Sequence, residues 1–372
     1  MAAIGDLQYA GRASPWPVAV ASLMIAASVI LPGCKSGEGS AASSSPPPAV
    51  AIGAAGSTFV APIMAHWIEG YRAAHPTVQI NYRPIGSGAG IEELKKGLTE
   101  FAASDAPLGD VELQAMPPLI QVPVTAGPVC LIYNLPQLDR PLRLSAKVLA
   151  GIYLGDIISW QDAAIAKDNP GLRLPRAAII VVHRTDGSGT TNILTEYLRK
   201  VSGEWSRKAG HGLSVSWPVG LGAAGSKGVL DFVKQATGTV GYLELNYAKE
   251  NGVPCAAIQN EAGEFVSPTP AAAGAAVEAF REALAKDVRN PIVDPDPSAK
   301  NSYPVSGLSF VLIPKERPDE ETQRAIRDFV AYAISTVQEI TEGLSYAKLP
   351  ESVREQGRQI LGQLSAKGQP LR

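Results

Sequence analysis

Three short segments combine glycine with a hydroxyl side chain, and each lies between an apolar run and an amphipathic segment. They are residues 56–59 (GSTF), 86–90 (GSGAG) and 184–191 (RTDGSGTT). At each place the pattern predicts a strand, a small-residue turn and the start of a helix. A helix N-terminus exposes unpaired backbone N–H groups and a partial positive charge, and glycine lets a ligand approach the backbone. Each turn therefore suits an anion.

A simpler interpretation is that Thr58, Ser87 and Ser188 only cap the helices that follow them. Capping would explain any one of these turns by itself. Three turns of the same kind, with Arg184 in one of them, instead favour convergence on a single anion. The sequence therefore predicts one local anion-binding site, with helix capping as the alternative.

Other kinds of site find little support in the sequence. Residues 86–90 lack the GxGxxG spacing of a dinucleotide site, although Asp105 lies downstream, and residues 220–227 (GLGAAGSK) have Ser and Lys in the wrong order for a P-loop. No GxSxG turn is present, and no His or Lys base lies beside the hydroxyl turns. The histidines and cysteines lack the spacing of metal ligands. We expect no catalytic site, no metal and no cofactor.

The elements that must position the turns follow an alternating pattern. Strands are predicted at 50–54, 78–82 and 101–104, with helices at 59–74 and 90–99 between them. Further strands are predicted at 129–133, 179–183 and 308–313, and further helices at 190–201, 228–235, 272–285 and 321–334. This alternation predicts an α/β protein with parallel or mixed sheets, whose ligands lie at the carboxyl ends of the strands.

A leader sequence is predicted for residues 1–33. The apolar run 18–31 has fourteen residues, which suits a signal peptide better than a membrane-spanning helix, and it stops just before Cys34. Residues 31–34 (LPGC) resemble a bacterial lipobox, which implies cleavage before Cys34, a diacylglycerol on its thiol and palmitate in the lipid anchor. An ordinary secretory signal with a chance cysteine is the alternative. The Ser- and Pro-rich residues 34–48 are expected to form a tether.

Composition limits the other partners. The 372 residues include 33 Lys and Arg against 35 Asp and Glu, so the net charge is −2. No bulk positive field exists to hold nucleic acid or an anionic membrane. We therefore expect neither of them as a partner held by overall charge. The length predicts two domains. Cys130 is expected to be a buried packing thiol, and a disulfide with Cys255 is the alternative.

Several ordered strings of the sequence resemble one family. They are GSTFVAPIMAHW at 56–67, PIGSGAG at 84–90, ASDAPL at 103–108, YLGDIISWQDAAIAKDNPGLRLP at 153–175, HRTDGSGTT at 183–191, WPVGLGAAGSKG at 217–228 and GTVGYLE at 238–244. They resemble the phosphate-binding proteins of the bacterial phosphate ABC transporter, the PstS family, over about residues 49–350. The lipobox and the long tether are similar to those of the lipoprotein branch of this family.

The resemblance implies a type II periplasmic-binding-protein fold, in which two α/β lobes are joined by two crossover strands with the ligand cleft between them. Lobe I would combine residues 49–124 with 304–372, and lobe II would be residues 125–303. The protein would bind inorganic phosphate with high affinity outside the cytoplasmic membrane. It would then deliver the phosphate to an importer with two transmembrane and two ATPase subunits, while a lipid anchor holds it to a bacterial membrane.

The resemblance also implies which residues bind phosphate. By match to the family's motifs they are Thr58, Phe59 (through its backbone N–H), Ser87, Asp105, Arg184, Ser188, Gly189 and Thr190. Asp186 would orient Arg184. The family more often has Ala and Pro where this chain has Ser57 and Val60.

Asp105 has a distinct predicted role, because hydrogen phosphate carries a proton that needs an acceptor. A fully ionised sulfate would face this carboxylate with lone pairs only, which is repulsive in a dry cleft. Asp105 is therefore expected to select phosphate over sulfate, and a helix N-cap is the alternative role.

Three alternatives to phosphate import remain open. A phosphate sensor or scavenger without a transporter would share every motif, and so would a protein that binds another tetrahedral oxyanion. A phosphate-ester hydrolase is the enzymatic alternative, and it would need a nucleophile or metal that the sequence does not reveal.

Overall fold

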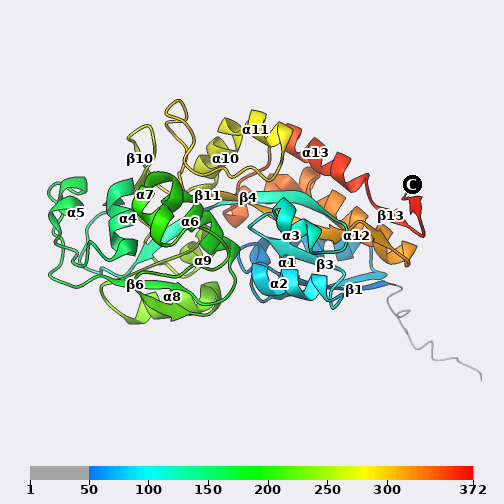
Figure 1. Cartoon of the computed structure of the whole chain (residues 1–372), viewed down its shortest axis with the longest axis horizontal. Helices are drawn as coiled ribbons and strands as arrows, with labels where there is room; N and C mark the ends of the chain where they lie inside the picture. The colour runs from blue at the N-terminus through cyan, green and yellow to red at the C-terminus, as the bar shows by residue number, and fades with distance from the viewer. Residues whose placement is uncertain (1–49, 372) are drawn as a thin grey trace, which may run out of the picture. The chain divides into compact units, whose positions relative to one another are not determined.

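The computed structural model describes residues 50–371 (Figure 1). The predicted signal peptide, Cys34 and nearly all of the tether lie outside these residues. The described chain begins with β1 (Val50–Gly56), α1 (Ala61–Ala74), β2 (Val78–Pro84), α2 (Ser87–Lys95) and β3 (Phe101–Ser104). This order confirms the predicted alternation of strands and helices. Both β2 and β3 pair with β1 in parallel, so the carboxyl ends of the three strands lie at one edge.

Helix α2 is displaced from its prediction at 90–99, and two glycines explain why. Gly86 has φ +95°, which turns the chain sharply and lets the helix begin at Ser87. Gly97 has φ +68° and ends the helix, with the N–H of Leu98 donating to the carbonyl of Glu93 at 2.9 Å.

The chain continues through α3 (Asp110–Gln114) into the long strand β4 (Leu119–Tyr133). Only its last third was predicted, because Pro123 and Gly127 interrupt the apolar pattern of the rest. The partner of β4 is β11 (Ser306–Pro314), and their antiparallel register shifts between Ser309 and Phe310, opposite Pro123. This β-bulge accommodates the proline within a buried strand.

One eight-stranded sheet contains all the strands that end at the predicted turns. Its order is β2-β1-β3-β11-β4-β8-β6-β7, in which β8 is Thr239–Glu244, β6 is Ile180–Arg184 and β7 is Leu221–Ala223. β6 is parallel to β7 and β8, whereas β8 is antiparallel to β4. Figure 1 shows β4 between two groups of elements, one with β1 and β3 and the other with β6 and α8. The proposed lobe boundaries at 124 and 304 lie within β4 and two residues before β11.

Helices cover the sheet on both sides of β4. α2 packs on β1 and β3, and α6 (Gly189–Val201) and α8 (Gly225–Gln235) pack on β8. The C-terminal helices α12 (Glu320–Ala333) and α13 (Glu351–Leu361) return to pack on β1 and β4 respectively. The predicted helix 272–285 is two helices, α10 (Pro270–Ala279) and α11 (Arg281–Lys286), because Phe280 leaves the helical conformation.

The smaller elements complete the chain. They are β5 (Arg143–Leu144), α4 (Ala146–Leu154), α5 (Ala163–Asp168), α7 (Gly203–Lys208), α9 (Leu245–Glu250), β9 (Ala257–Gln259), β10 (Phe265–Val266), β12 (Glu316–Arg317), the 3₁₀ turns η1 (Thr336–Ile340) and η2 (Glu342–Leu344), β13 (Ser365–Ala366) and β14 (Gln369–Pro370).

The turn after β1 is held by aromatic side chains from distant parts of the chain. The hydroxyl of Tyr346 donates to the carbonyl of Phe59 at 2.6 Å, and the two rings meet edge to face at 5.8 Å. The hydroxyl of Tyr82 donates to the carbonyl of Ser57 at 2.7 Å. Because Phe59 and Tyr346 are buried and Tyr82 is partly buried, this turn is fixed on a packed core.

The prediction for the cysteines can be compared with the described residues. Cys130 is buried and Cys255 partly buried, and both are free thiols. Within residues 50–371, no helix is long and apolar enough to cross a membrane.

Candidate functional site

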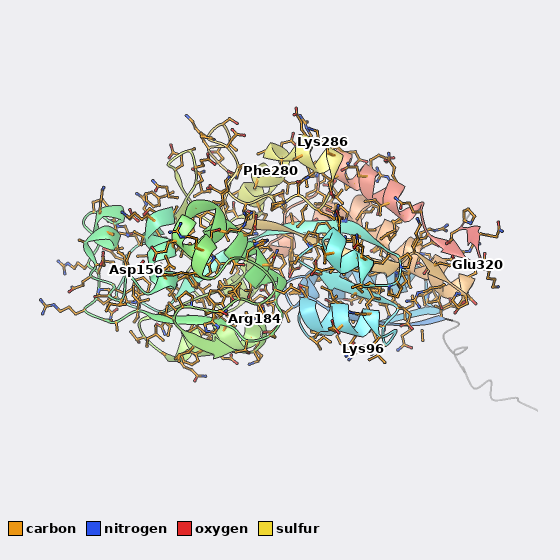
Figure 2. All side chains as sticks on the ribbon, viewed as in Figure 1. Lys96, Asp156, Arg184, Phe280, Lys286 and Glu320 are labelled. Carbon is orange, nitrogen blue, oxygen red and sulfur yellow. The ribbon has the colours of Figure 1, made fainter. Side chains whose placement is uncertain are left out.

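Arg184 ends β6 and lies at the centre of the predicted site. Its side chain is 1% exposed, and its backbone N–H donates to the hydroxyl of Tyr242 at 3.0 Å. Its Nε donates to Oδ1 of Asp186 at 2.7 Å, and its Nη2 donates to Oδ2 of the same carboxylate. Figure 2 labels Arg184 close to where the green elements meet the blue and cyan ones. The two oxygens of the Asp186 carboxylate therefore hold the guanidinium plane of Arg184 in place.

The remaining nitrogen of Arg184 reaches the turn after β1. Nη1 donates to Oγ1 of Thr58 at 3.3 Å and to Oγ of Ser226 at 3.2 Å. Thr58 and Arg184 are 126 positions apart in sequence, and the fold brings them together. Burial alone would raise the pKa of Asp186, but its hydrogen bonds and charge pairing with Arg184 hold it below the ordinary range.

Asp105 follows β3 and is only 3% exposed. Its Oδ2 accepts hydrogen bonds from the hydroxyls of Ser57 at 2.6 Å and Ser87 at 3.5 Å, and its Oδ1 accepts one from Ser309 at 2.8 Å. Burial raises the pKa of Asp105 to about 6, although these hydroxyls and the charge of Arg184 act in the opposite direction. The carboxyl is a buried acceptor among hydroxyl donors.

The second and third turns touch each other. The backbone N–H of Gly189 donates to Oγ of Ser87 at 3.2 Å, and that of Gly88 donates to the carbonyl of Gly187 at 2.8 Å. A Cβ at Gly86 would lie 2.6 Å from Oδ2 of Asp186. The glycines of these turns therefore permit a close approach that side chains would block.

The capping alternative holds for one of the three hydroxyls. Oγ of Ser188 accepts from the N–H of Thr191 at 3.2 Å and so caps α6. Ser87 is instead the first residue of α2 and bonds to Asp105 and Gly189. Thr58 lies three residues before α1, which has Val60 at its N-cap position. Asp105 is not an N-cap, because α3 begins five residues later at Asp110.

The first turn differs from its prediction in one hydrogen bond. The N–H of Phe59, predicted to point at a ligand, donates to Oγ of Ser57 at 3.0 Å, and the N–H of Val60 reaches the same oxygen at 3.3 Å. Ser57 thus satisfies the backbone donors of this turn and also contacts Asp105. From its sequence, Ser57 is predicted only to depart from the family pattern, which more often has Ala at this position.

Three more buried residues belong to the site and were missed. They are Ser226, Glu244 and Ser309. Ser226 lies in residues 217–228, which contribute to the family resemblance but have the wrong order for a P-loop, and Glu244 ends β8, a strand that the sequence did not predict. The one signal for Glu244 was a charged residue at the end of the apolar string GTVGYLE. Ser309 carried no signal, because it lies within an apolar strand.

The arrangement is suited to hold a small oxyanion that also carries a proton. Hydroxyls, backbone N–H groups and one guanidinium supply donors, and Asp105 supplies an acceptor. Among the described residues, no group of three or more His, Cys, Asp and Glu side chains is arranged to hold a metal ion. The chemistry that the site supports is recognition of an anion by hydrogen bonds.

Comparison with known proteins shows the family to which the chain belongs. Residues 41–337 match the model of the PBP superfamily domain, which covers more than half of the chain. The phosphate-binding protein PstS of Xylella fastidiosa (strain Temecula1) is 38% identical over 348 residues, which are 90% of this chain and 94% of that protein. PstS of Pasteurella multocida is 40% identical over 305 residues, or 81% and 87% of the two chains. The chain belongs to the PstS family of phosphate-binding proteins.

A solved structure agrees on the fold. The periplasmic phosphate-binding protein PfluDING, bound with phosphate, matches with a TM-score of 0.65 at 21% identity, over 83% of this chain and 93% of that one. This likeness and the family match confirm the predicted fold of two α/β lobes around crossover strands. β4 and β11, which lie between the two halves of the sheet, are those strands.

Proposed function

We propose that this protein binds inorganic phosphate outside the cytoplasmic membrane and delivers it to an ABC-type importer. Membership of the PstS family supports the ligand, and the likeness to a periplasmic protein supports the compartment. The observation that carries the proposal is that Asp105 and Arg184 lie in one buried cluster, in which Asp105 accepts a hydrogen bond from Ser57 and Arg184 donates one to the adjacent Thr58. The role is binding and not catalysis.

The phosphate ligands are those of the family motifs. Arg184, held by Asp186, neutralises charge, and the hydroxyls of Thr58, Ser87, Ser188 and Thr190 donate hydrogen bonds. The backbone N–H groups of Phe59 and Gly189 complete the donors, after exchanging their present partners Ser57 and Ser87 for a phosphate oxygen. Such an exchange requires little energy, because a buried donor keeps one partner before and after.

Asp105 supplies the selectivity. It accepts the proton of hydrogen phosphate, whereas sulfate at neutral pH has no proton to offer and would be repelled. In a buried site this repulsion is not screened by water, so its effect is larger than at a surface.

The two lobes are proposed to be residues 49–124 with 304–372, and residues 125–303. Thr58, Ser87 and Asp105 come from lobe I and Arg184 to Thr190 from lobe II, so a ligand between them favours closure by a hinge at the crossover strands. The closed form is proposed to be recognised by a permease with two transmembrane and two ATPase subunits. Cleavage before Cys34 and its lipidation would anchor the protein at the membrane.

Isothermal titration calorimetry of the purified protein with phosphate, arsenate and sulfate tests the ligand. We expect tight phosphate binding and much weaker sulfate binding. Stronger binding of another oxyanion would support the alternative ligand. Deletion of the gene tests delivery, because uptake of phosphate at low concentration should fall. Unchanged uptake, with no second phosphate-binding protein expressed, would support a sensor or scavenger instead.

A further inference from the structure

Ser226 joins Glu244 to Thr58 through a continuous chain of hydrogen bonds. Oγ of Ser226 lies 2.9 Å from Oε2 of Glu244 and 2.9 Å from Oγ1 of Thr58. Ser226 is the second residue of α8 and Glu244 ends β8, whereas Thr58 belongs to the turn after β1. Ser226 and Glu244 are at most 1% exposed. This chain of hydrogen bonds therefore connects a buried carboxyl of one proposed lobe to a proposed phosphate ligand of the other.

The number of protons in this chain limits how it can be arranged. A hydroxyl has one proton to donate and two lone pairs to accept with. Nη1 of Arg184 donates to Oγ of Ser226 at 3.2 Å, which uses one lone pair of that oxygen. One lone pair and one proton remain for Glu244 and Thr58. Ser226 must therefore donate to one of these neighbours and accept from the other.

The protonation of Glu244 decides the direction. An ionised carboxylate can only accept, so Ser226 donates to Glu244 and Thr58 must donate to Ser226. The hydroxyl proton of Thr58 is then donated to Ser226 and is not available to another partner. A protonated carboxyl donates to Ser226 instead, and Ser226 donates to Thr58. Thr58 accepts from Ser226 and from Arg184, at 3.3 Å, and its own proton is free for another partner.

We propose that a proton on Glu244 acts through Ser226 to free the Thr58 hydroxyl as a donor to phosphate, so that phosphate binding is coupled to proton uptake from solvent at Glu244. This inference rests on the proposed function, because it takes Thr58 as a phosphate ligand. Glu244 is a positioning residue in this scheme and does not touch the ligand. The coupling makes binding tighter at lower pH.

The surroundings of Glu244 favour the neutral form. Its Oε1 has no hydrogen-bond partner among the described residues, which would leave an ionised oxygen buried without a donor. Burial raises the pKa of Glu244 to about 8, against the charge of Arg184. Within the described part of the chain, the charged or titratable groups that face it from other elements are Asp105, Arg184, Cys130, Tyr247 and Tyr346. Arg184 is the one cation among them, and it is already paired with Asp186.

Calorimetry in two phosphate-free buffers with different enthalpies of ionisation measures the coupling directly. At about pH 9 phosphate is a dianion and Glu244 is mostly ionised, so binding should take up close to one proton. In Glu244→Gln the amide N–H donates to Ser226 as the protonated carboxyl does. We expect this variant to bind phosphate with no linked proton. Above the pKa of Glu244, the phosphate affinity of the wild-type protein should fall by a factor that approaches about tenfold per pH unit. The phosphate affinity of Glu244→Gln should not fall in this way.

A second variant separates the chain of hydrogen bonds from simple charge repulsion. Ser226→Ala leaves Glu244 in place but disconnects it from Thr58. Loss of proton uptake in Ser226→Ala supports the inference. Uptake equal to that of the wild type would overturn it, because charge repulsion between phosphate and Glu244 would then be enough to explain the proton uptake. Glu250→Gln changes an exposed acid of α9 and is the control, with unchanged uptake expected. Melting temperatures of all variants check that they fold.

The outcomes distinguish failure of the proton coupling at Glu244 from failure of the proposed phosphate binding. If the wild-type protein binds phosphate but takes up as many protons as Glu244→Gln, the inference fails and the proposed function stands. If the wild-type protein does not bind phosphate at any pH, the proposed function itself fails.

Discussion

Gly189 lies directly against Asp105. A Cβ on Gly189 would lie 2.6 Å from the Cβ of Asp105 and 2.7 Å from its Oδ2, so only glycine fits at this contact. The contact joins the first residue of α6 to the residue after β3 and therefore holds the two halves of the site together. It also keeps the Asp105 carboxyl beside the N-terminus of a helix.

Gly189→Ala should therefore push the two turns apart. We expect phosphate affinity to fall at least tenfold, while the protein still folds, because alanine can adopt the first position of a helix without strain. Calorimetry and melting temperature measure the two effects. Gly274→Ala in α10 is the control, since its Cβ would meet only Ala347 at 4.0 Å and both affinity and fold should be kept. Unaltered affinity in Gly189→Ala would show that this contact does not matter for binding.

Arg184→Ala should weaken phosphate binding more than loss of any single hydroxyl. A hydrogen bond to a charged group contributes about 1.5–3 kcal/mol, and the change also leaves Asp186 without its cation beside an anionic ligand. The expected decrease in affinity is therefore tenfold to more than a hundredfold. Calorimetry measures it, with Arg83→Ala as the control, because Arg83 pairs with Glu93 at the surface. A loss of less than threefold would contradict a role for Arg184 in binding.

Asp105→Asn should relax selectivity more than it weakens phosphate binding. The amide oxygen can still accept the phosphate proton, and the amide N–H can donate to sulfate. We expect the ratio of sulfate to phosphate affinity to rise in the variant. Competitive calorimetry of both anions measures the ratio. If it is the same as in wild type, Asp105 does not set selectivity, and other residues of the site must do so.

The same carboxyl predicts how sulfate binding depends on pH. Because burial raises the pKa of Asp105 to about 6 in the free protein, the carboxyl gains a proton as the pH falls through that value. A protonated Asp105 donates a hydrogen bond to sulfate and no longer repels it. Sulfate affinity should therefore rise between about pH 7 and pH 5 in wild type, and rise less in Asp105→Asn. Equal pH dependence in the two proteins would assign the effect to another group.

Cys34 is predicted to carry the lipid anchor. Metabolic labelling with a fatty-acid analogue in cells should mark the wild-type protein and leave Cys34→Ala unlabelled. The Cys255→Ala variant is a control that should keep the label. Equal labelling of wild type and Cys34→Ala, or none in either, would show that the lipobox resemblance is a coincidence.

Much of the site could be predicted from local sequence. The turns after β1, β2 and β6 each combine glycine and hydroxyl residues over a few positions, so their chemistry is visible without a fold. Strand β3 was predicted with its observed ends, and Asp105 follows it directly. The fold itself was implied by resemblance, since alternating strands and helices alone suit many α/β proteins.

Tertiary structure decided which side chains meet. Thr58 and Ser226 are separated by 168 positions and lie 2.9 Å apart, and no periodicity or spacing relates them. The sequence placed Thr58 as a helix cap or a ligand, but Ser57 satisfies the backbone donors of that turn instead. Such choices depend on competition among neighbouring hydroxyls, which only a packed structure resolves.

Glu244 shows the same limit most clearly. Its sequence context is the end of an apolar string, which predicts neither its burial nor that its Oε1 has no hydrogen-bond partner within residues 50–371. Glu244 is buried where α8 and α9 pack on β8 and where Tyr346 lies near the carboxyl, and these residues come from different parts of the chain. Local chemistry could therefore be predicted from the residues themselves. The protonation of a buried carboxyl depends instead on desolvation, which exists only after distant segments have packed together.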